Sequence, residues 1–238
     1  MLKKFFCALS IIIVLSVLSA GASFAATAEG LIQEALAALT GMSHEDDARS
    51  MAKTLNGAYA VAIVPSFVKA GFVLGGSYGE GLILKREKGK WYGPSFYNIG
   101  GGSFGLQIGV QDASLFLVVI NRKGVDAFLS SKTKLGGELS VAAGPVGRTA
   151  QAATDAQMKA SIYSYSMTRG LFAGVALDGS VISISVKRND EYWKGYVKKA
   201  DKDGDGKVSA KEALMVPAAD KRIRPLTKAL DEFIKKAK

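Results

Sequence analysis

The sequence predicts an α+β fold: N-terminal helices, then a glycine-rich, mainly antiparallel and strongly curved β-sheet, then a small C-terminal helix-loop-helix. Apolar residues recur at helical spacing before residue 57, and short strand-like runs fill the stretch from Tyr59 to Val186. A polar helical pattern resumes beyond Asn189. The regular strand–helix alternation that is typical of parallel α/β proteins does not appear, which favours an antiparallel sheet.

Two helices are expected first. The second begins near Ser43, because this residue is a good N-cap and acidic residues follow it at 45–47. It ends near Asn56-Gly57, a typical stop signal. The first is indicated by one apolar face, formed by Leu31, Ile32, Ala35, Leu36 and Leu39.

Strands are expected from Tyr59 onward. Lys88-Gly89-Lys90 predicts a chain reversal, and Asp178-Gly179 predicts a hairpin turn between Leu171–Leu177 and the strand that follows. Glycine is dense between residues 71 and 147, so backbones can approach closely, bulge and curve. The expected strands are Tyr59–Val64 (ended by Pro65), Gly81–Lys85, Leu106–Val110, Leu115–Ile120, Leu139–Ala143 and Ile182–Val186.

No catalytic or nucleotide site is expected. Gly100 to Gly105 match GxGxxG, but strand-like alternation follows where a dinucleotide site needs a helix. The single histidine, His44, lies near the cap of a surface helix, and no nucleophile has an activating base in its sequence context. The sequence therefore predicts a protein that is not an enzyme and does not bind nucleic acid. An atypical hydrolase acting on envelope lipid or peptidoglycan remains a minor alternative.

A calcium-binding loop is predicted at residues 201–212, which read DKDGDGKVSAKE. Gly206 stands at position 6, where the chain must turn sharply around the ion. The alternative is a plain Asp/Gly-rich turn, which requires neither the closing glutamate nor the apolar Val208. The ligand offsets are filled by Asp201, Asp203 and Asp205, the backbone carbonyl of Lys207, Ser209 through a water, and Glu212 as a bidentate ligand.

The affinity of this loop for Ca²⁺ should be weak, on the order of 10⁻⁴ to 10⁻³ M. Three lysines within the loop (Lys202, Lys207 and Lys211) offset its carboxylates, and no second loop is present in the sequence to pair with it. A structural role is therefore favoured over sensing. Val208 could pair with the same residue of another copy, which would give a homodimer through the loop.

The N-terminal 25 residues are predicted to be an export signal. Lys3 and Lys4 precede an apolar run over Phe5–Ala20, and Ser23-Phe24-Ala25 offers small residues for cleavage. The expected location is the periplasm or outer envelope, or outside the cell. Without these two lysines the chain has 29 of its 31 basic residues and 21 acidic residues, so basic residues are in excess. This excess indicates an anionic lipid surface as partner, or serves solubility alone.

Four blocks stand out in this order along the chain: Ala60–Leu84, Gly100–Gln111 with Asn121, Lys134–Arg148, and Thr154–Gly179. They resemble the SYLF domain family, a lipid-binding family that is also labelled an actin-binding domain from its yeast members. The resemblance implies an α+β domain without catalysis that binds phospholipids, phosphoinositides in eukaryotic members. Actin binding is not expected of an exported, bacterial-looking chain.

Two departures from the family pattern matter. Met167, just after the IYSYS stretch at 162–166, replaces an expected arginine-like residue, so only Arg169 remains basic at that point. The family usually ends soon after an element echoed by Asn189 and Tyr192-Trp193, whereas this chain continues into the calcium loop. The predicted division is therefore 1–25 signal peptide, 26–189 SYLF-like domain, and 190–238 calcium loop with a basic C-terminal helix.

The preferred function is that of an exported, calcium-stabilised lipid-binding protein. The alternative is a structural, adhesive or oligomerisation module that is stabilised by calcium and in which lipid binding is incidental. Several basic residues must act together at an anionic surface, since each contributes only about 1 kcal/mol. The candidate lipid-binding residues near the glycine-rich strands are Lys69, Lys85, Arg86, Lys88, Lys90 and Arg169.

Overall fold

The computed structural model describes residues 27–42, 48–137, 139–145, 160–168, 171–174 and 177–236, with the backbone alone at 71–74, 103–109 and 171–174. The expected signal segment, the Ser43 cap, His44 and Arg169 lie outside the described residues. Of the helices in the described part, none has the length and apolar character needed to cross a membrane.

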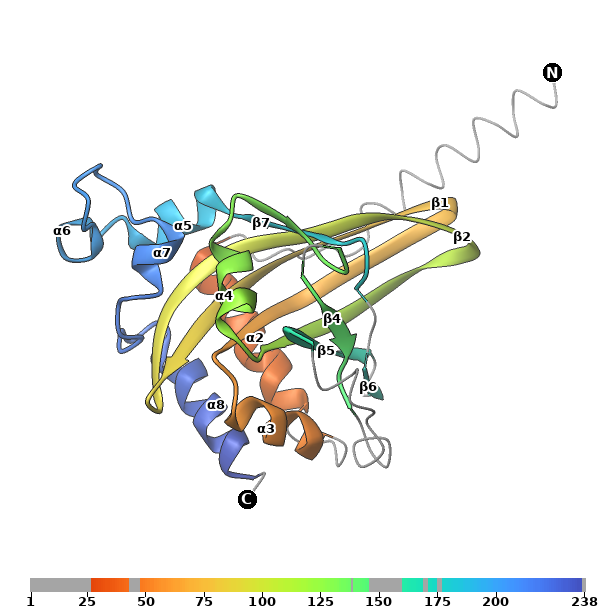
Figure 1. Cartoon of the computed structure of the whole chain (residues 1–238), viewed down its shortest axis with the longest axis horizontal. Coiled ribbons are helices and arrows are strands. Elements are labelled where there is room, and N and C mark those ends of the chain that lie inside the picture. Colours follow the sequence, from red (N-terminus) through yellow and green to blue (C-terminus); the bar gives the residue numbers. More distant parts are fainter. Residues whose placement is uncertain are drawn as a thin grey trace.

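Helices pack against a long curved sheet, one end of which extends beyond them (Figure 1). The predicted α+β architecture with N-terminal helices, curved sheet and C-terminal helix is confirmed. The elements are α2 (Ala28–Met42), α3 (Ala48–Asn56), β1 (Ala60–Glu87), β2 (Lys90–Val119), α4 (Arg122–Leu129), β3 (Lys132–Lys134), β4 (Val141–Ala143), β5 (Ile162–Thr168), β6 (Leu171–Gly174), β7 (Val181–Ile184), α5 (Val186–Trp193), α6 (Val197–Ala200), α7 (Ala210–Ala213) and α8 (Arg224–Lys235).

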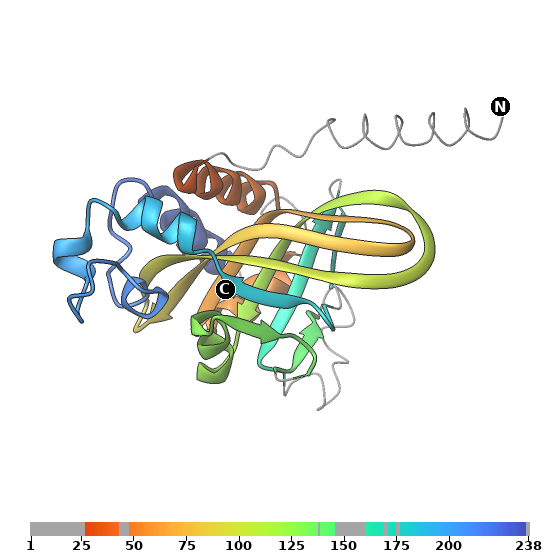
Figure 2. The same ribbon diagram turned by 90° about the horizontal axis from the view of Figure 1, so that it is seen from above.

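Strands β1 and β2 form one antiparallel ribbon that doubles back on itself (Figure 2). The two strands meet at Lys88-Gly89, both with positive φ, which confirms the predicted reversal. The end of β1 returns beside its own beginning, since the Arg86 N–H donates to the Tyr59 carbonyl at 2.7 Å. Four of the predicted strands are thus segments of two long ones. Pro65 does not end a strand as predicted, because the register shifts there and absorbs it.

Glycine allows the doubled ribbon to pack against itself. A Cβ added at Gly79 would lie 2.5 Å from Cγ1 of Val64, and one at Gly81 would lie 2.6 Å from the Ile63 carbonyl oxygen. Real Cβ atoms do not approach other atoms so closely, so the two layers of β1 can meet only where one side lacks a side chain. The predicted role of glycine in close approach is confirmed at these positions.

The sheet has seven strands in the order β3-β7-β2-β5-β4, with β1 paired to β2 and β6 paired to β5. Its pairs are antiparallel except β4 with β5. The GxGxxG run lies within β2, as its strand-like alternation predicted. The hairpin predicted at Asp178-Gly179 is wrong. A turn forms there, but β6 pairs with β5 while β7 pairs with β2 and β3.

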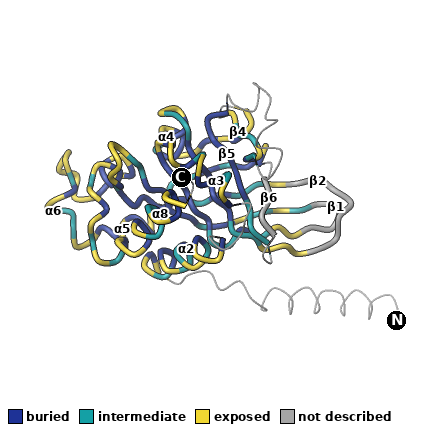
Figure 3. Tube along the Cα trace, turned by 90° about the horizontal axis from the view of Figure 1, so that it is seen from below, coloured by how far each residue is buried: buried dark blue, intermediate teal, exposed yellow. Residues whose placement is uncertain are grey.

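Both faces of the sheet are buried near its centre (Figure 3). Val61 and Ile63 belong to a core cluster shared with α2, α3 and α8. Their neighbours Ala62 and Val64 belong to a second cluster on the opposite face, which α4 completes. Successive residues of a strand point to opposite faces, so the apolar run at 59–64 is continuous because both faces need apolar side chains.

The C-terminal segment is part of the same core. Asn189 is buried and holds α5 against β2, accepting from Phe96 N–H at 3.0 Å and donating to its carbonyl at 2.9 Å. Trp193 Nε1 donates to the Pro94 carbonyl at 3.1 Å, and Trp91 Nε1 donates to Asp231 of α8 at 2.8 Å. The division at residue 189 stays a prediction, and the packing runs across it.

Candidate calcium loop and basic cleft

The carboxylates of Asp201, Asp203 and Asp205 converge, with one oxygen from each lying within 4.8 Å of the others. Oxygens that share a Ca²⁺ ion at about 2.3–2.6 Å can be no farther apart than about 5 Å, so the trio fits one such ion. The loop's own amides orient these groups: Asp201 accepts from Gly204 N–H at 2.7 Å and from Gly206 N–H at 2.9 Å. Both glycines have positive φ, near +80°.

Glu212, the predicted closing ligand, is not part of that trio. Its Oε2 accepts from the amide and the hydroxyl of Ser209 at 2.9 and 2.7 Å, and its Oε1 accepts from Lys202 N–H. Ser209 and Glu212 thus form a capping box at the start of α7. Donation by the Ser209 hydroxyl, then by the Lys202 and Ser209 amides, lowers the pKa of Glu212 to about 2.

The loop is anchored from inside by Val208, which is 4% exposed and belongs to the core cluster of the helical face. Ala200 before the loop and Ala213 after it are buried in the same cluster. This anchoring fixes both ends of the loop. It also means that the Val208 side chain packs within its own chain, rather than presenting an apolar surface for a neighbouring loop.

Four of the predicted lipid-binding residues gather at the turn between β1 and β2, and Lys69 is exposed elsewhere on β1. Lys88 and Lys90 are exposed at the turn. Lys85 pairs with Glu87 at 3.0 Å. Arg86 is already engaged, since Nη1 donates to the Asn56 carbonyl at 3.0 Å and the guanidinium lies 5.5 Å from the Trp91 ring centre.

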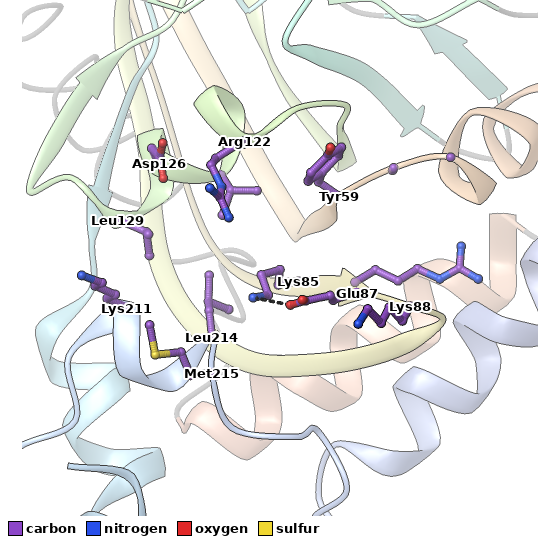
Figure 4. Close-up of a pocket in the computed structure, with 14 residues that line it drawn as sticks. Tyr59, Lys85, Glu87, Lys88, Arg122, Asp126, Leu129, Lys211, Leu214 and Met215 are labelled. Carbon is purple, nitrogen blue, oxygen red and sulfur yellow. Dashed lines mark ion pairs between the residues drawn. The ribbon is translucent and has the colours of Figure 1, made fainter. Parts of the chain in front are cut away.

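A cleft of about 560 Å³ opens beside this turn (Figure 4). Strand β1 forms one wall, α4 contributes Arg122 to another, and the turn after α7 contributes Met215. Five basic and two acidic side chains line it, among apolar ones. The charged lining residues are Lys85, Arg86, Lys88, Arg122, Lys211, Glu87 and Asp126, and the larger apolar ones are Tyr59, Val125, Leu129, Leu214 and Met215.

Sequence reasoning missed Arg122, Tyr59 and Met215 as site residues. They come from three separate elements, and only the fold brings them to the basic turn. Lys211 was noted solely as a charge within the calcium loop, yet it lines the cleft. Arg122 begins α4 directly after its N-cap, Asn121, which accepts from Gly124 N–H at 2.9 Å.

Comparison with known proteins identifies the family. The model of the Ysc84 family, described as Las17-binding protein actin regulator, matches residues 100–233. The chain belongs to the Ysc84 (SYLF) family. The match covers Arg122 and the whole loop at 201–212, and the lysines of the β1–β2 turn precede it.

Similar proteins occur in fungi and animals. The chain is 43% identical over 133 residues to the SH3 domain-containing protein PJ696.02 of Schizosaccharomyces pombe, covering 54% of this chain and 30% of that protein. It is 35% identical over 130 residues to human SH3 domain-containing YSC84-like protein 1, covering 54% and 38%. It is 36% identical over 143 residues to LAS seventeen-binding protein 3 of Saccharomyces cerevisiae, covering 58% and 31%. The chain thus spans about a third of the length of these Ysc84 relatives.

Proposed function

We propose that this chain is a non-enzymatic, exported lipid-binding protein of the cell envelope that carries one structural calcium loop. The lipid part rests on one observation: Lys85, Lys88 and Lys90 gather at one end of the ribbon, beside a cleft that is also mainly basic. Membership of the Ysc84 (SYLF) family supports it, and the relatives are named as SH3 domain-containing and Las17-binding proteins rather than as enzymes.

The attraction to an anionic surface should be electrostatic and cooperative. Each lysine near such a surface contributes about 1 kcal/mol, and the effect fades beyond a Debye length of about 8–10 Å. Only residues that reach the surface together can add their contributions. Lys88 and Lys90 meet this condition because both are exposed, on either side of Gly89, at the turn between β1 and β2.

Vesicle sedimentation tests the proposal. Anionic vesicles should pellet the protein at low salt, and neutral phosphatidylcholine vesicles should not. The double variant Lys88→Gln/Lys90→Gln should weaken the anionic binding by about tenfold or more, since two cations are removed. Lys132→Gln/Lys134→Gln is the matched control, because it removes the same charge from two exposed residues of β3. Equal binding to both vesicle types, or equal loss in both variants, would remove the lipid proposal.

The calcium part rests on the converging aspartates and the match of the loop to the calcium-binding pattern. Calorimetry of the purified protein should give one Ca²⁺ per chain with an affinity on the order of 10⁻⁴ to 10⁻³ M. Glu212→Gln should lose most of that affinity, whereas Glu232→Gln on the exposed face of α8 should not. Submicromolar binding, or a Glu212 variant that binds like the parent, would contradict the proposal.

The second candidate is a calcium-stabilised structural or adhesive module, with a homodimer formed through the loop. Light scattering with calcium and with chelator distinguishes it, since the dimer should double the mass only with calcium. Burial of Val208 within the chain weighs against the pairing originally expected of that residue. A dimer would have to use the exposed loop residues 202–207 instead.

Export and actin binding have separate tests. Export predicts a mature protein that starts at Ala26 and is recovered from the envelope or medium, which N-terminal sequencing would show. The family description and the name of the yeast relative concern Las17 and actin regulation, and they weigh against the expectation that this chain does not bind actin. Cosedimentation with filamentous actin decides this point.

A further inference from the structure

The basic cleft combines cationic groups with an apolar lining, whereas an exposed lysine cluster offers charge alone. Its charged groups come from β1, α4 and the start of α7. Within the described part of the chain, Lys88, Arg122 and Lys211 have no ion-pair partner. An anion entering the cleft would therefore meet cations that are not yet neutralised.

Glu87 shows that this part of the cleft favours negative charge. Its carboxylate pairs with Lys85 at 3.0 Å, and Lys85, Lys88 and Arg122 together hold the pKa of Glu87 below its usual value. Lys85, Glu87 and Lys88 lie together along the β1 side of the cleft, and Arg122 comes from α4 on another wall (Figure 4). A ligand's anionic group that binds Lys85 would therefore have to compete with this carboxylate.

The remaining lining is apolar and partly open to solvent. Of its apolar residues, Leu214 is buried and Leu129 is half-buried. Tyr59 and Met215 are each 51% exposed, and they belong to a small set of large apolar side chains exposed in the described residues. Large apolar side chains beside a cavity mark binding surfaces, and a volume near 560 Å³ is within the range of small-molecule sites.

We propose that the cleft binds a single anionic phospholipid. The phosphate lies against Arg122 and Lys88, and the Arg122 guanidinium can donate to two phosphate oxygens at once. In this position the phosphate displaces the Glu87 carboxylate from Lys85. The glycerol and first acyl carbons lie against Leu129, Leu214 and Met215. This inference rests on the proposed lipid binding and deepens it, since it adds a defined site for one molecule to the attraction of a surface.

The experiment uses short-chain phosphatidic acid below its micelle-forming concentration, titrated into the whole protein in a calorimeter. Short-chain phosphatidylcholine and inorganic phosphate are titrated in parallel. Arg122→Gln should weaken phosphatidic acid binding about fivefold, because one cation is lost. Glu87→Gln should tighten it several-fold, because the competing carboxylate is gone. Lys132→Gln, an exposed lysine of β3 outside the cleft, is the control and should change nothing.

A 1:1 complex with phosphatidic acid, tightened by Glu87→Gln and weakened by Arg122→Gln, supports the site. Equal affinity for inorganic phosphate would overturn it, because the apolar wall would then contribute nothing. Absence of 1:1 binding while anionic vesicles still pellet the protein would overturn the cleft alone and leave the surface attraction standing. Loss of both would remove the proposed function as well. Circular dichroism of each variant separates a binding defect from unfolding.

Discussion

Glu212 should stabilise the fold even when calcium is absent. Its carboxylate accepts three hydrogen bonds, two from Ser209 and one from Lys202, and so ties the two ends of the loop together. In Glu212→Gln one oxygen becomes an amide NH₂ group. If the remaining oxygen keeps the two Ser209 donors, the NH₂ group faces the Lys202 N–H, and two donors oppose each other.

The expected loss follows from the bonds removed. Hydrogen bonds to a charged acceptor contribute about 1.5–3 kcal/mol, and the exposed Lys202 amide can regain part of this from water. We therefore expect Glu212→Gln to lower the free energy of unfolding by about 2 kcal/mol, or the melting temperature by about 4–8 °C for a chain of this size. Urea denaturation in chelator at pH 7 measures it. The control is Glu232→Gln, whose exposed pair with Lys228 at 3.8 Å should contribute almost nothing.

The pH dependence gives a second check. The pKa of Glu212 is about 2 in the folded chain and about 4.3 in an unfolded one, so its contribution is complete above the unfolded value. That contribution is lost as the pH falls from about 5 toward 2, because the folded carboxylate must then be protonated. The difference between parent and variant should shrink over this range. Equal stability at neutral pH, or a difference that acid leaves unchanged, would refute the reasoning.

Three further predictions concern the fold and the ion. Gly81→Ala should destabilise the protein by about 1–3 kcal/mol or more by urea denaturation, since its Cβ would overlap the Ile63 carbonyl, whereas Gly102→Ala meets nothing within 4 Å and should be tolerated. Glu80→Gln should cost about 1–3 kcal/mol in the same assay, because the nearly buried Arg188 loses the carboxylate that accepts from it at 2.9 Å and keeps Glu191, at 3.3 Å, as an anionic partner. About 5 mM calcium should raise the stability of the parent protein by about 1–2 kcal/mol in thermal denaturation, given the proposed affinity.

Much of this fold could be predicted from the sequence, and the failures have physical causes. The helical spacing from Leu31 to Leu39 and the positive-φ turn at Lys88-Gly89 are local signals, and both predictions are confirmed. The length of β1 and β2 could not be predicted, because glycines interrupt the apolar pattern wherever the ribbon bends or packs on itself. The predicted pairing of the strands on either side of Asp178-Gly179 was wrong, because a turn reverses the chain but does not determine which strand of the sheet each segment pairs with.

The candidate site divides in the same way. The convergence of three aspartates depends on twelve consecutive residues, so their spacing alone predicted it. The cleft depends on elements that are far apart in sequence. Only the basic residues of the β1–β2 turn, at its edge, could therefore be predicted as site residues. The position of Glu212 also escaped prediction, because the loop amides compete with an ion for its oxygens.

Helix α7 is a single turn that belongs both to the loop and to the cleft. In the proposed calcium-bound loop, Glu212 would have to leave Ser209 and Lys202 to join the aspartates. Lys211 and Leu214, which are close to it in sequence, line the cleft. A movement of this turn therefore reaches both sites at once. Equilibrium linkage requires the effect to be mutual: whatever factor calcium applies to the affinity for lipid, lipid applies to the affinity for calcium. A loop of weak affinity would then hold its ion more tightly on a membrane than in solution, if the shared turn favours both ligands.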